Sequence, residues 1–224
     1  MQPTDNARLW LVRHGETDYN VAGRIQGQIP TELNANGHAQ AAKLARYFAP
    51  KPFAAVWSSD LPRARQTAEA IAAPLKLPVN TTTDFRERNF GQFEGKTTDE
   101  IHLIKKSMGL TSTGDLAEWS GVPGIESDEE LWGRFANTMK KLSTDYRGKD
   151  VLIITHGGAI KLALYKILGI PTGQPRRFPL SNGILAITQF RNDAFYLLSM
   201  VDLPLLFDHE TSADTATSKP KLST

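Results

Sequence analysis

The sequence predicts an α/β fold in which a largely parallel sheet is covered by helices on both faces and has one antiparallel edge. Helical patterns alternate with short apolar runs through most of the 224 residues, as in parallel sheets joined by crossover helices. Two of these runs, residues 8–12 and 151–155, are each followed closely by a histidine. Residues 184–190 and 195–201 are strand patterns separated by Arg191-Asn192-Asp193, which is typical of a hairpin.

Four apolar runs are the expected parallel strands: residues 8–12, 53–57, 78–82 and 151–155. Each is short and is bounded by polar, proline or glycine residues, which is the pattern of a buried strand. The run at 78–82 is the weakest of the four, because asparagine and threonine dominate it. In sheets of this kind ligands bind at the carboxyl ends of the strands, so the residues that follow each run are candidates for a site.

Five segments carry helical patterns. In the first, apolar residues recur at intervals of three and four, and prolines end the pattern. In the second, Ser58-Ser59-Asp60 supplies the expected N-cap and Pro62 suits the first turn. A capping box from Ser127 to Glu130 opens the fourth. The expected helices are residues 34–48, 62–73, 98–107, 127–146 and 158–168.

We expect a single domain over residues 1–208. Residues 109–124 are rich in glycine, serine and threonine and have no regular apolar spacing, so the region of about 97–126 is interpreted as a flap insertion. The tail at 209–224 consists mainly of serine, threonine, alanine and lysine. A segment of that composition buries too little apolar surface to fold, so we expect it to be disordered.

The composition excludes several classes of function. The chain has no cysteine, which excludes disulfides, thiolate zinc sites and a cysteine nucleophile. A formal net charge of +2 without a basic run argues against nucleic acid as a partner. No apolar run approaches the ~18 residues of a membrane span, and residues 1–6 lack the pattern of a signal peptide. We therefore expect a cytoplasmic protein with no membrane partner.

Two histidines and two arginines are expected at one edge of the sheet. His14 and His156 follow parallel strands, and Arg63 lies in the first turn of the helix after another strand. Arg13, Arg63 and a protonated His156 would place about three positive charges in one crevice. A phosphate dianion binds in such a setting through charge-assisted and bidentate hydrogen bonds. The alternative for Arg63 is that its side chain only covers the core.

Backbone and neutral groups complete the predicted phosphate site. Gly15 and Gly157 allow backbone amides to approach a ligand closely. The helix that begins near Gly158 presents its positive end to the same crevice. Asn20 adds a neutral donor, with a helix cap as its alternative role.

These residues favour phosphoryl transfer through an imidazole. With no cysteine and no Ser-His-Asp order in the sequence, an imidazole nitrogen is the best candidate nucleophile. The leaving oxygen needs a proton, which we assign to Glu87, and the same carboxylate then activates water. The alternatives are a surface ion pair of Glu87 with Arg86 or Arg88, and Glu94 as the acid. Guanidinium groups stabilise the charge, so no metal or other cofactor is expected, and the remaining histidines, His38, His102 and His209, have no ligand spacing.

The sequence resembles the histidine phosphatase, or phosphoglycerate mutase-like, superfamily in four motifs that occur in the family's order over roughly residues 8–202. Residues 11–17 contain the Arg-His-Gly signature, and residues 59–68, Ser-Asp-Leu-Pro-Arg-Ala-Arg-Gln-Thr-Ala, resemble the second motif. Glu87, followed by Phe90-Gly91 and Glu94-Gly95, resembles the third, and Thr155-His156-Gly157-Gly158 the fourth. Residues 29–34 depart from the family, because they read Ile-Pro-Thr-Glu-Leu-Asn where Asp-x-Pro-Leu-Thr is usual.

The resemblance implies a three-layer α/β/α sandwich. It also implies that His14 is the nucleophile and Glu87 the proton donor. Arg13, Arg63 and His156, with Asn20 assisting, are implied as the phosphate pocket.

Residues 23–27, Gly-Arg-Ile-Gln-Gly, resemble the phosphatase branch of the family, which includes α-ribazole phosphatase and broad-specificity phosphatases. Arg24, Gln26 and Gly27 are therefore expected to contact the substrate. Mutases of the family tend to carry a longer insertion between the loop that holds the proton donor, here Glu87, and the second histidine, here His156. In this sequence that span is short.

We predict a metal-independent phosphatase that hydrolyses a small phosphomonoester through a phosphohistidine at His14. One alternative is a phosphoglycerate mutase that depends on a bisphosphorylated cofactor, and another is a non-catalytic module that binds phosphorylated ligands. The substrate's leaving group would be read by residues 21–34 and 97–126. The exposed edge of the terminal hairpin allows a homodimer.

Overall fold

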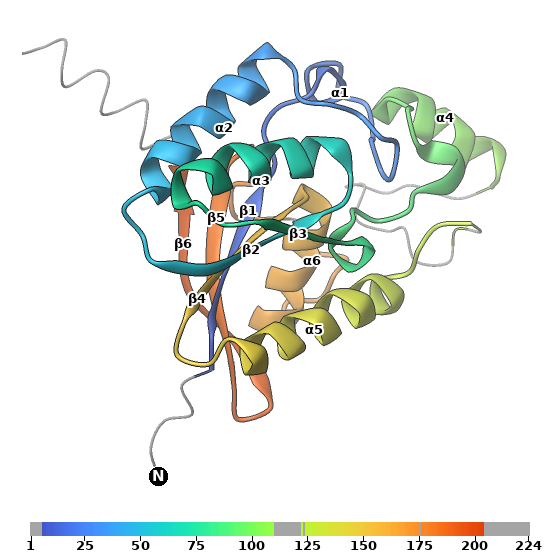
Figure 1. The fold of residues 1–224 in the computed structure, drawn as a ribbon. Helices are drawn as coiled ribbons and strands as arrows, with labels where there is room; N and C mark the ends of the chain where they lie inside the picture. Colours follow the sequence, from blue (N-terminus) through green and yellow to red (C-terminus); the bar gives the residue numbers. More distant parts are fainter. Residues whose placement is uncertain (1–5, 110–121, 123, 175, 204–224) are drawn as a thin grey trace, which may run out of the picture.

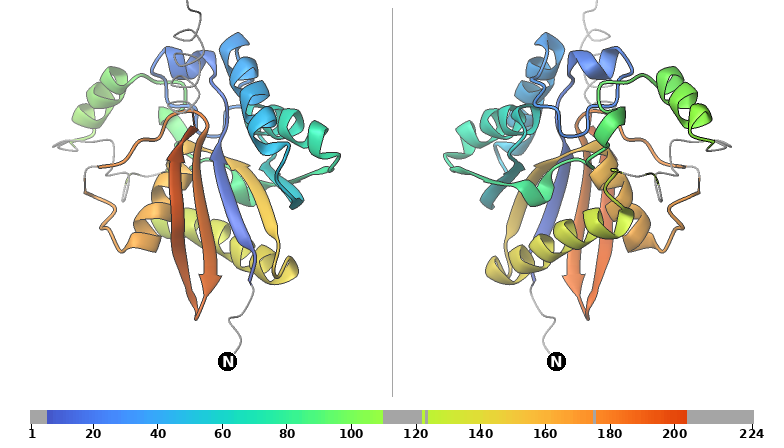
Figure 2. Two further views of the ribbon diagram at one scale, coloured as in Figure 1. Left: turned by 90° about the vertical axis from the view of Figure 1, so that its left-hand side faces the viewer. Right: turned by 90° about the vertical axis from the view of Figure 1, so that its right-hand side faces the viewer.

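The computed structural model describes residues 6–109, 122, 124–174 and 176–203 and contains a six-stranded sheet between two layers of helices (Figures 1 and 2). The strand order is β3-β2-β4-β1-β5-β6. The four strands on one side of this order are parallel to one another, whereas β5 runs antiparallel to both β1 and β6. The strands are β1 (Arg8–Arg13), β2 (Phe53–Ser59), β3 (Val79–Thr82), β4 (Asp150–Thr155), β5 (Ile184–Arg191) and β6 (Ala194–Asp202). The predicted three-layer sandwich with an antiparallel edge is confirmed.

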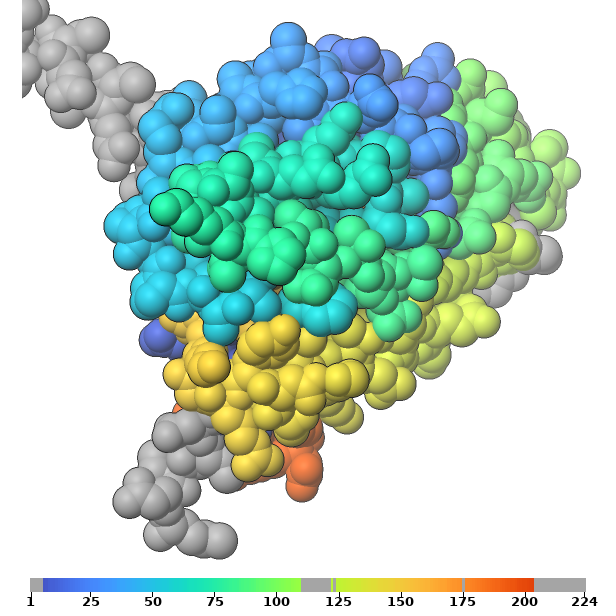
Figure 3. Space-filling view, viewed as in Figure 1, coloured from blue at the N-terminus to red at the C-terminus, as the bar shows by residue number. Residues whose placement is uncertain are grey.

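Side chains alternate between the two faces of the sheet and build a core on each. Leu9 and Leu11 of β1 belong to the core beneath α5 and α6, whereas Val12 belongs to the core beneath α2 and α3. Helices α2 and α3 lie against each other without a gap in the space-filling view (Figure 3). The helices are α1 (Asp18–Val21), α2 (Ala35–Phe48), α3 (Pro62–Leu75), α4 (Thr98–Ser107), α5 (Asp128–Asp145) and α6 (Gly157–Leu168), with short 3₁₀ turns η1 (Thr83–Phe85) and η2 (Gly91–Phe93).

The register of β1 and β4 brings the two histidine segments together. Arg13 is opposite Thr155 in this parallel pair, and the backbone N–H of His14 donates to the carbonyl of Thr155 at 3.0 Å. The next residue of each chain segment is therefore a histidine at the carboxyl edge of the sheet. β2 ends at the same edge and leads directly into α3, which carries Arg63.

Helix α3 begins at Pro62 as predicted, but the predicted N-cap residues are wrong. Ser58 and Ser59 are buried residues of β2, and the N-cap position is Leu61, which makes no side-chain cap. Asp60 instead accepts from Arg86, whose Nη2 lies 2.5 Å from a carboxylate oxygen of Asp60. Strand β2 continues through Ser58 and Ser59 because these residues pair with the neighbouring strands β3 and β4. Residue preference alone does not reveal this pairing.

Several predictions lie partly or wholly outside the described residues. The flap at 97–126 includes α4, but most of its remainder is not described, and the tail at 209–224 is outside the description entirely. Both stay predictions. Within the described part of the chain, no helix has the length and apolar character to cross a membrane.

Candidate active site

His14 is held at the end of β1 in one defined orientation. Its side chain is buried, and its Nδ1 lies 2.6 Å from the carbonyl oxygen of Gly15. Its Nε2 lies 3.3 Å from Nε of Arg63. A carbonyl only accepts and a guanidinium only donates, so Nδ1 carries the proton and Nε2 presents a lone pair.

Arg63 is the most enclosed cation of the site, with 1% of its surface exposed. Its Nη1 donates to the carbonyl of Ile29 at 2.8 Å and to Oγ1 of Thr31 at 3.1 Å, and its Nη2 donates to the carbonyl of Gly27 at 2.8 Å. The guanidinium therefore lies between His14 and the loop at residues 27–31, which contradicts the alternative that Arg63 only covers the core. The segment that departs from the family pattern still supplies partners for this arginine.

Arg13 and His156 bring the remaining nitrogen atoms. Arg13 Nη1 donates to the carbonyl of Leu180, and its Nε has no partner among the described residues. The ring of His156 is fully buried, with its centroid 5.1 Å from that of His14. Neither ring nitrogen of His156 has a hydrogen-bond partner in the part of the chain that is described. Buried polar atoms normally have partners, so we expect these nitrogens to bind a ligand, although the ring is not among the residues that line the pocket.

Both histidines are neutral in the unliganded site. The pKa of His14 and that of His156 are lowered well below 6.5, first by burial and then by the charge of Arg63. The expectation of a protonated His156 is wrong for this state, because the ring is buried and two arginines occupy the same crevice. Burial also lowers the pKa values of Arg13 and Arg63 to about 10, which leaves both arginines charged at neutral pH.

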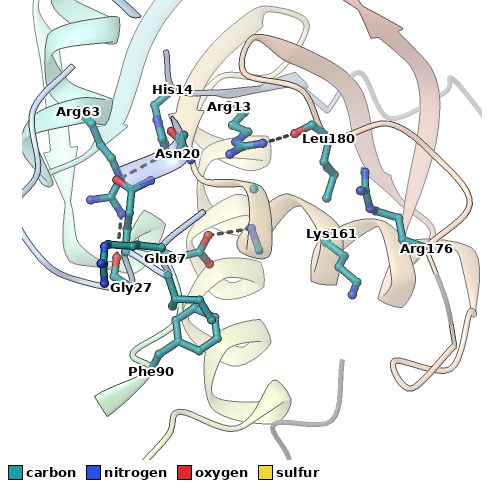
Figure 4. A pocket seen from close by; sticks show the side chains of 15 residues that line it. Arg13, His14, Asn20, Gly27, Arg63, Glu87, Phe90, Lys161, Arg176 and Leu180 are labelled. Carbon is teal, nitrogen blue, oxygen red and sulfur yellow. Dashed lines mark hydrogen bonds between the residues drawn. The ribbon is translucent and has the colours of Figure 1, made fainter. Parts of the chain in front are cut away.

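Glu87 lines the same pocket as His14 (Figure 4). One carboxylate oxygen of Glu87 accepts from the backbone N–H of Gly158 at 2.7 Å, and the other accepts from the backbone N–H of Arg88 at 2.8 Å. Arg86 pairs with Asp60 and Arg88 with Asp128, so neither arginine makes the surface ion pair considered for Glu87.

The competing acid, Glu94, has a structural role. Its carboxylate accepts from the backbone N–H groups of Gln28 and Phe90, at 2.9 and 3.1 Å. These contacts hold two loops together beside the pocket, and Glu94 is not among the residues that line it.

Gly158 is required for the position of Glu87. A Cβ atom at this residue would lie 2.4 Å from a carboxylate oxygen of Glu87. Gly157 is also close to the site, because a Cβ there would lie 3.1 Å from Nε of Arg13. The two glycines thus allow α6 to begin directly beneath the pocket.

Asn20 and Gln26 line the pocket with their amide groups. Asn20 belongs to a capping box at the start of α1, in which its oxygen accepts from the N–H of Thr17 at 3.1 Å. The oxygen of Gln26 accepts from the hydroxyls of Thr17 and Thr31, at 3.0 and 2.6 Å. Because both oxygens are used by the protein, the amide nitrogens are the groups that remain to donate to a ligand. The cap and the donor role of Asn20 are therefore compatible.

Arg24 and Gly27 also line the pocket, but their polar groups serve the protein. Arg24 donates to the carbonyl of Gly95 at 2.8 Å and lies 3.3 Å from the carboxylate of Glu100. The carbonyl of Gly27 accepts from Arg63, and its φ of +52° favours glycine. The structure places both residues where the prediction put them, and their contact with a substrate stays a prediction.

The pocket is a cavity of about 320 Å³. Its lining includes four residues that the sequence interpretation missed: Phe90, Lys161, Arg176 and Leu180. Lys161 had a signal, since it is one of two charged residues in the otherwise apolar α6. Among the described residues, no group of three or more His, Cys, Asp or Glu side chains is arranged to hold a metal ion.

The fold and the site define an α/β sandwich with a histidine and arginine anion pocket at the carboxyl edge of its sheet. The chain belongs to the histidine phosphatase superfamily (branch 1), whose model matches residues 9–203.

Relatives of the chain carry both phosphatase and mutase names. It is 34% identical over 167 residues to phosphoglycerate mutase-like protein 4 of Arabidopsis thaliana, covering 74% of this chain and 72% of the relative. It is 37% identical over 163 residues to metal-independent phosphoserine phosphatase of the same plant, covering 70% and 67%. The solved structure of a mutant phosphoserine phosphatase from Entamoeba histolytica, in complex with phosphoserine, has a TM-score of 0.71 and 28% identity, covering 88% of this chain and 97% of that one.

Proposed function

We propose that this protein is a phosphatase that hydrolyses a small phosphomonoester through a phosphohistidine at Nε2 of His14. The observation that carries the proposal is the orientation of this ring, with Nδ1–H on the carbonyl of Gly15 and the Nε2 lone pair beside Arg63. A neutral imidazole in this tautomer is the form that attacks phosphorus.

In the first step, Nε2 of His14 attacks the phosphorus atom, and the bond from phosphorus to the ester oxygen breaks. Arg13 and Arg63 balance the charge of the transferring group, and the unpartnered ring of His156 hydrogen-bonds to one of its oxygens. Glu87, in its protonated form, gives its proton to the leaving oxygen.

In the second step, the Glu87 carboxylate takes a proton from water, and the resulting hydroxide attacks phosphorus as the P–N bond breaks. Inorganic phosphate leaves, the lone pair returns to Nε2 of His14, and Glu87 is again protonated. Protein groups balance the charge in this cycle, and Glu87 passes on each proton, the second of which comes from water. A relative described as a metal-independent phosphoserine phosphatase supports it, and we expect the activity to survive EDTA.

The test is a rapid-quench experiment with a ³²P-labelled phosphomonoester. We expect an acid-labile, base-stable label on His14, release of inorganic phosphate, and loss of both in His14→Ala. A matched variant, His38→Gln, changes an exposed histidine and keeps both. Turnover without a label at position 14 would overturn the proposal.

A phosphoglycerate mutase is the second candidate, because relatives such as phosphoglycerate mutase-like protein 4 carry that name. It would share the phosphohistidine but return the phosphoryl group to the substrate. Dependence on a bisphosphorylated primer, with no inorganic phosphate formed, would favour it. Tight phosphate binding with no turnover of p-nitrophenyl phosphate would instead favour a non-catalytic binding module.

A further inference from the structure

A tight turn at residues 29–31 lies directly against the side chain of Arg63. The backbone N–H of Thr31 donates to the carbonyl of Ile29 at 2.8 Å, which closes a three-residue turn around Pro30. Proline suits the centre of such a turn, because its ring restricts φ to the range that the turn requires and it has no N–H to satisfy. The turn belongs to the segment that departs from the family pattern.

This turn presents three acceptors to Arg63. The carbonyl of Ile29 and the hydroxyl of Thr31 accept from Nη1 of Arg63 at 2.8 and 3.1 Å, and the carbonyl of Thr31 accepts from the backbone N–H of Arg63 at 3.1 Å. Figure 4 shows the other guanidinium contacts, with His14 and with the carbonyl of Gly27. Of the three acceptors in the turn, only the hydroxyl can be removed by a substitution. Because Arg63 is buried, water has little access to replace it.

The same hydroxyl also contacts Gln26, a buried residue of the pocket lining. Oγ1 of Thr31 lies 2.6 Å from Oε1 of Gln26. A guanidinium only donates, so the hydroxyl accepts from Arg63 and gives its single proton to the amide oxygen. The amide nitrogen of Gln26 is then left to donate to a ligand. One hydroxyl therefore links a cation and an amide donor of the pocket.

We propose that Thr31 is a positioning residue that holds Arg63 and Gln26 in the geometry that binds the phosphoryl group. The role deepens the proposed function and rests on it for the identity of the anion. Thr31 does not line the cavity itself, so its effect passes through the two side chains that it contacts. Without the hydroxyl, Nη1 of Arg63 would lose one of its acceptors. The amide of Gln26 would be free to turn its oxygen towards the anion, which an acceptor repels.

The test measures the binding of inorganic phosphate by calorimetry in Thr31→Val, which replaces the hydroxyl by a methyl group of similar size. We expect Kd to rise about tenfold, since a hydrogen bond to a charged group contributes enough for such a factor. Thr31→Ser keeps the hydroxyl and should keep the original Kd. Thr81→Val is the matched control and should also keep it, because Thr81 is an exposed residue of β3 outside the pocket lining. Thr31→Ala also removes the hydroxyl and replaces Thr31→Val if the latter does not fold.

A second comparison separates positioning from a general loss of stability. In an Arg63→Lys background the guanidinium that the hydroxyl holds is absent, so adding Thr31→Val should raise Kd by a much smaller factor. A further rise as large as in the unmodified chain would overturn the proposal. So would equal rises in Thr31→Ser and Thr31→Val, because the hydroxyl would then not be the group that matters.

Turnover of p-nitrophenyl phosphate by the unmodified chain reports the proposed function separately. An unchanged Kd in a folded Thr31→Val chain, with turnover in the unmodified chain, would overturn the role of Thr31 and leave the phosphatase standing. The expected rise in Kd, with no turnover by the unmodified chain, would leave the role of Thr31 in anion binding standing and overturn the phosphatase.

Discussion

Two neutral imidazoles beside two charged guanidinium groups are the central feature of this molecule at the scale of single residues. Burial disfavours the protonated form of His14 and His156, and Arg63 adds to this effect in both cases. The arrangement keeps the nucleophile unprotonated while the arginines attract an anion. It also makes the stability of the unliganded fold depend on pH.

The first prediction concerns that dependence. Unfolded histidine has a pKa of about 6.5, and the folded pKa of both residues is lowered well below this value. Below pH 6.5 the unfolded chain therefore binds more protons, so stability that is present above this pH is lost as the pH falls. Between pH 7.5 and 5.5 the free energy of unfolding should fall by roughly 1 kcal/mol for each of the two histidines.

Chemical denaturation at the two pH values, in buffer without phosphate, measures this loss. His14→Gln and His156→Gln should each remove about half of the pH-dependent part, and His38→Gln, at an exposed position, should remove none. An unchanged loss in both of the first two variants would contradict the prediction.

The second prediction concerns Gly158. Alanine at this position would place Cβ 2.4 Å from the Glu87 carboxylate and displace it. If Glu87 is the general acid, kcat for alkyl phosphates should fall by about 100-fold, with a much smaller fall for p-nitrophenyl phosphate, whose leaving group needs no proton. Gly133→Ala is the control, because nothing lies within 4 Å of its added Cβ. Equal losses for the two substrate types would mean that Glu87 is not the acid.

At the scale of elements, α5 fixes the loop that carries Glu87. Arg134 of α5 donates to the carbonyls of Asp84, Arg86 and Glu87 at 2.7, 2.9 and 3.0 Å. The same guanidinium is paired with Glu126 at 2.6 Å. One side chain thus fixes three carbonyl positions of the acid loop relative to a helix of the core. Arg134 is a positioning residue by this geometry.

The third prediction tests that role. Arg134→Lys keeps the charge but loses the fork of donors, so kcat for alkyl phosphates should fall by about tenfold. The p-nitrophenyl phosphate rate should change little, and KM should be retained. Lys141→Met is the control on the same helix, because Lys141 forms an exposed ion pair with Asp145. A uniform loss of activity that follows the loss of thermal stability would show a structural role alone.

The elements were predictable from sequence where local pattern and global packing agree. The apolar stripe of α2 and the run of β4 are examples, and both are found within a residue of the expected bounds. The serines before α3 show the limit, since pairing with two neighbouring strands overrides their cap preference.

The candidate site was predictable from its motifs, because four residues that follow or flank strands meet at one sheet edge: Arg13, His14, Arg63 and His156. The protonation of His156 was not predictable, because it depends on burial next to two arginines. Lys161 and Arg176 were missed for a similar reason. Their position in the pocket is set by how α6 and the following segment pack, and no local pattern encodes that.

At the scale of the whole molecule, the site exists only when the sheet is assembled. Its groups come from the ends of β1 and β4, the first turns of α3 and α6, and the acid loop. Assembly brings Arg13 and Arg63 together, and each lowers the pKa of a neighbouring group by its charge. Folding therefore concentrates positive charge, and an anion that binds there should stabilise the entire fold.

The fourth prediction follows from this coupling. Inorganic phosphate at about 100 times its Kd should raise the free energy of unfolding by about 2.7 kcal/mol, which for a chain of this size is roughly 5–10 °C in Tm. Arg13→Gln removes one of the converging cations and should lose most of the rise, whereas Arg177→Gln, exposed and outside the pocket lining, should keep it. Potassium chloride at equal ionic strength separates binding from screening. An equal rise with chloride, or an undiminished rise in Arg13→Gln, would place the stabilising anion elsewhere. An anion bound between β1, α3 and α6 stabilises the entire fold because it links these three elements in one cooperative unit.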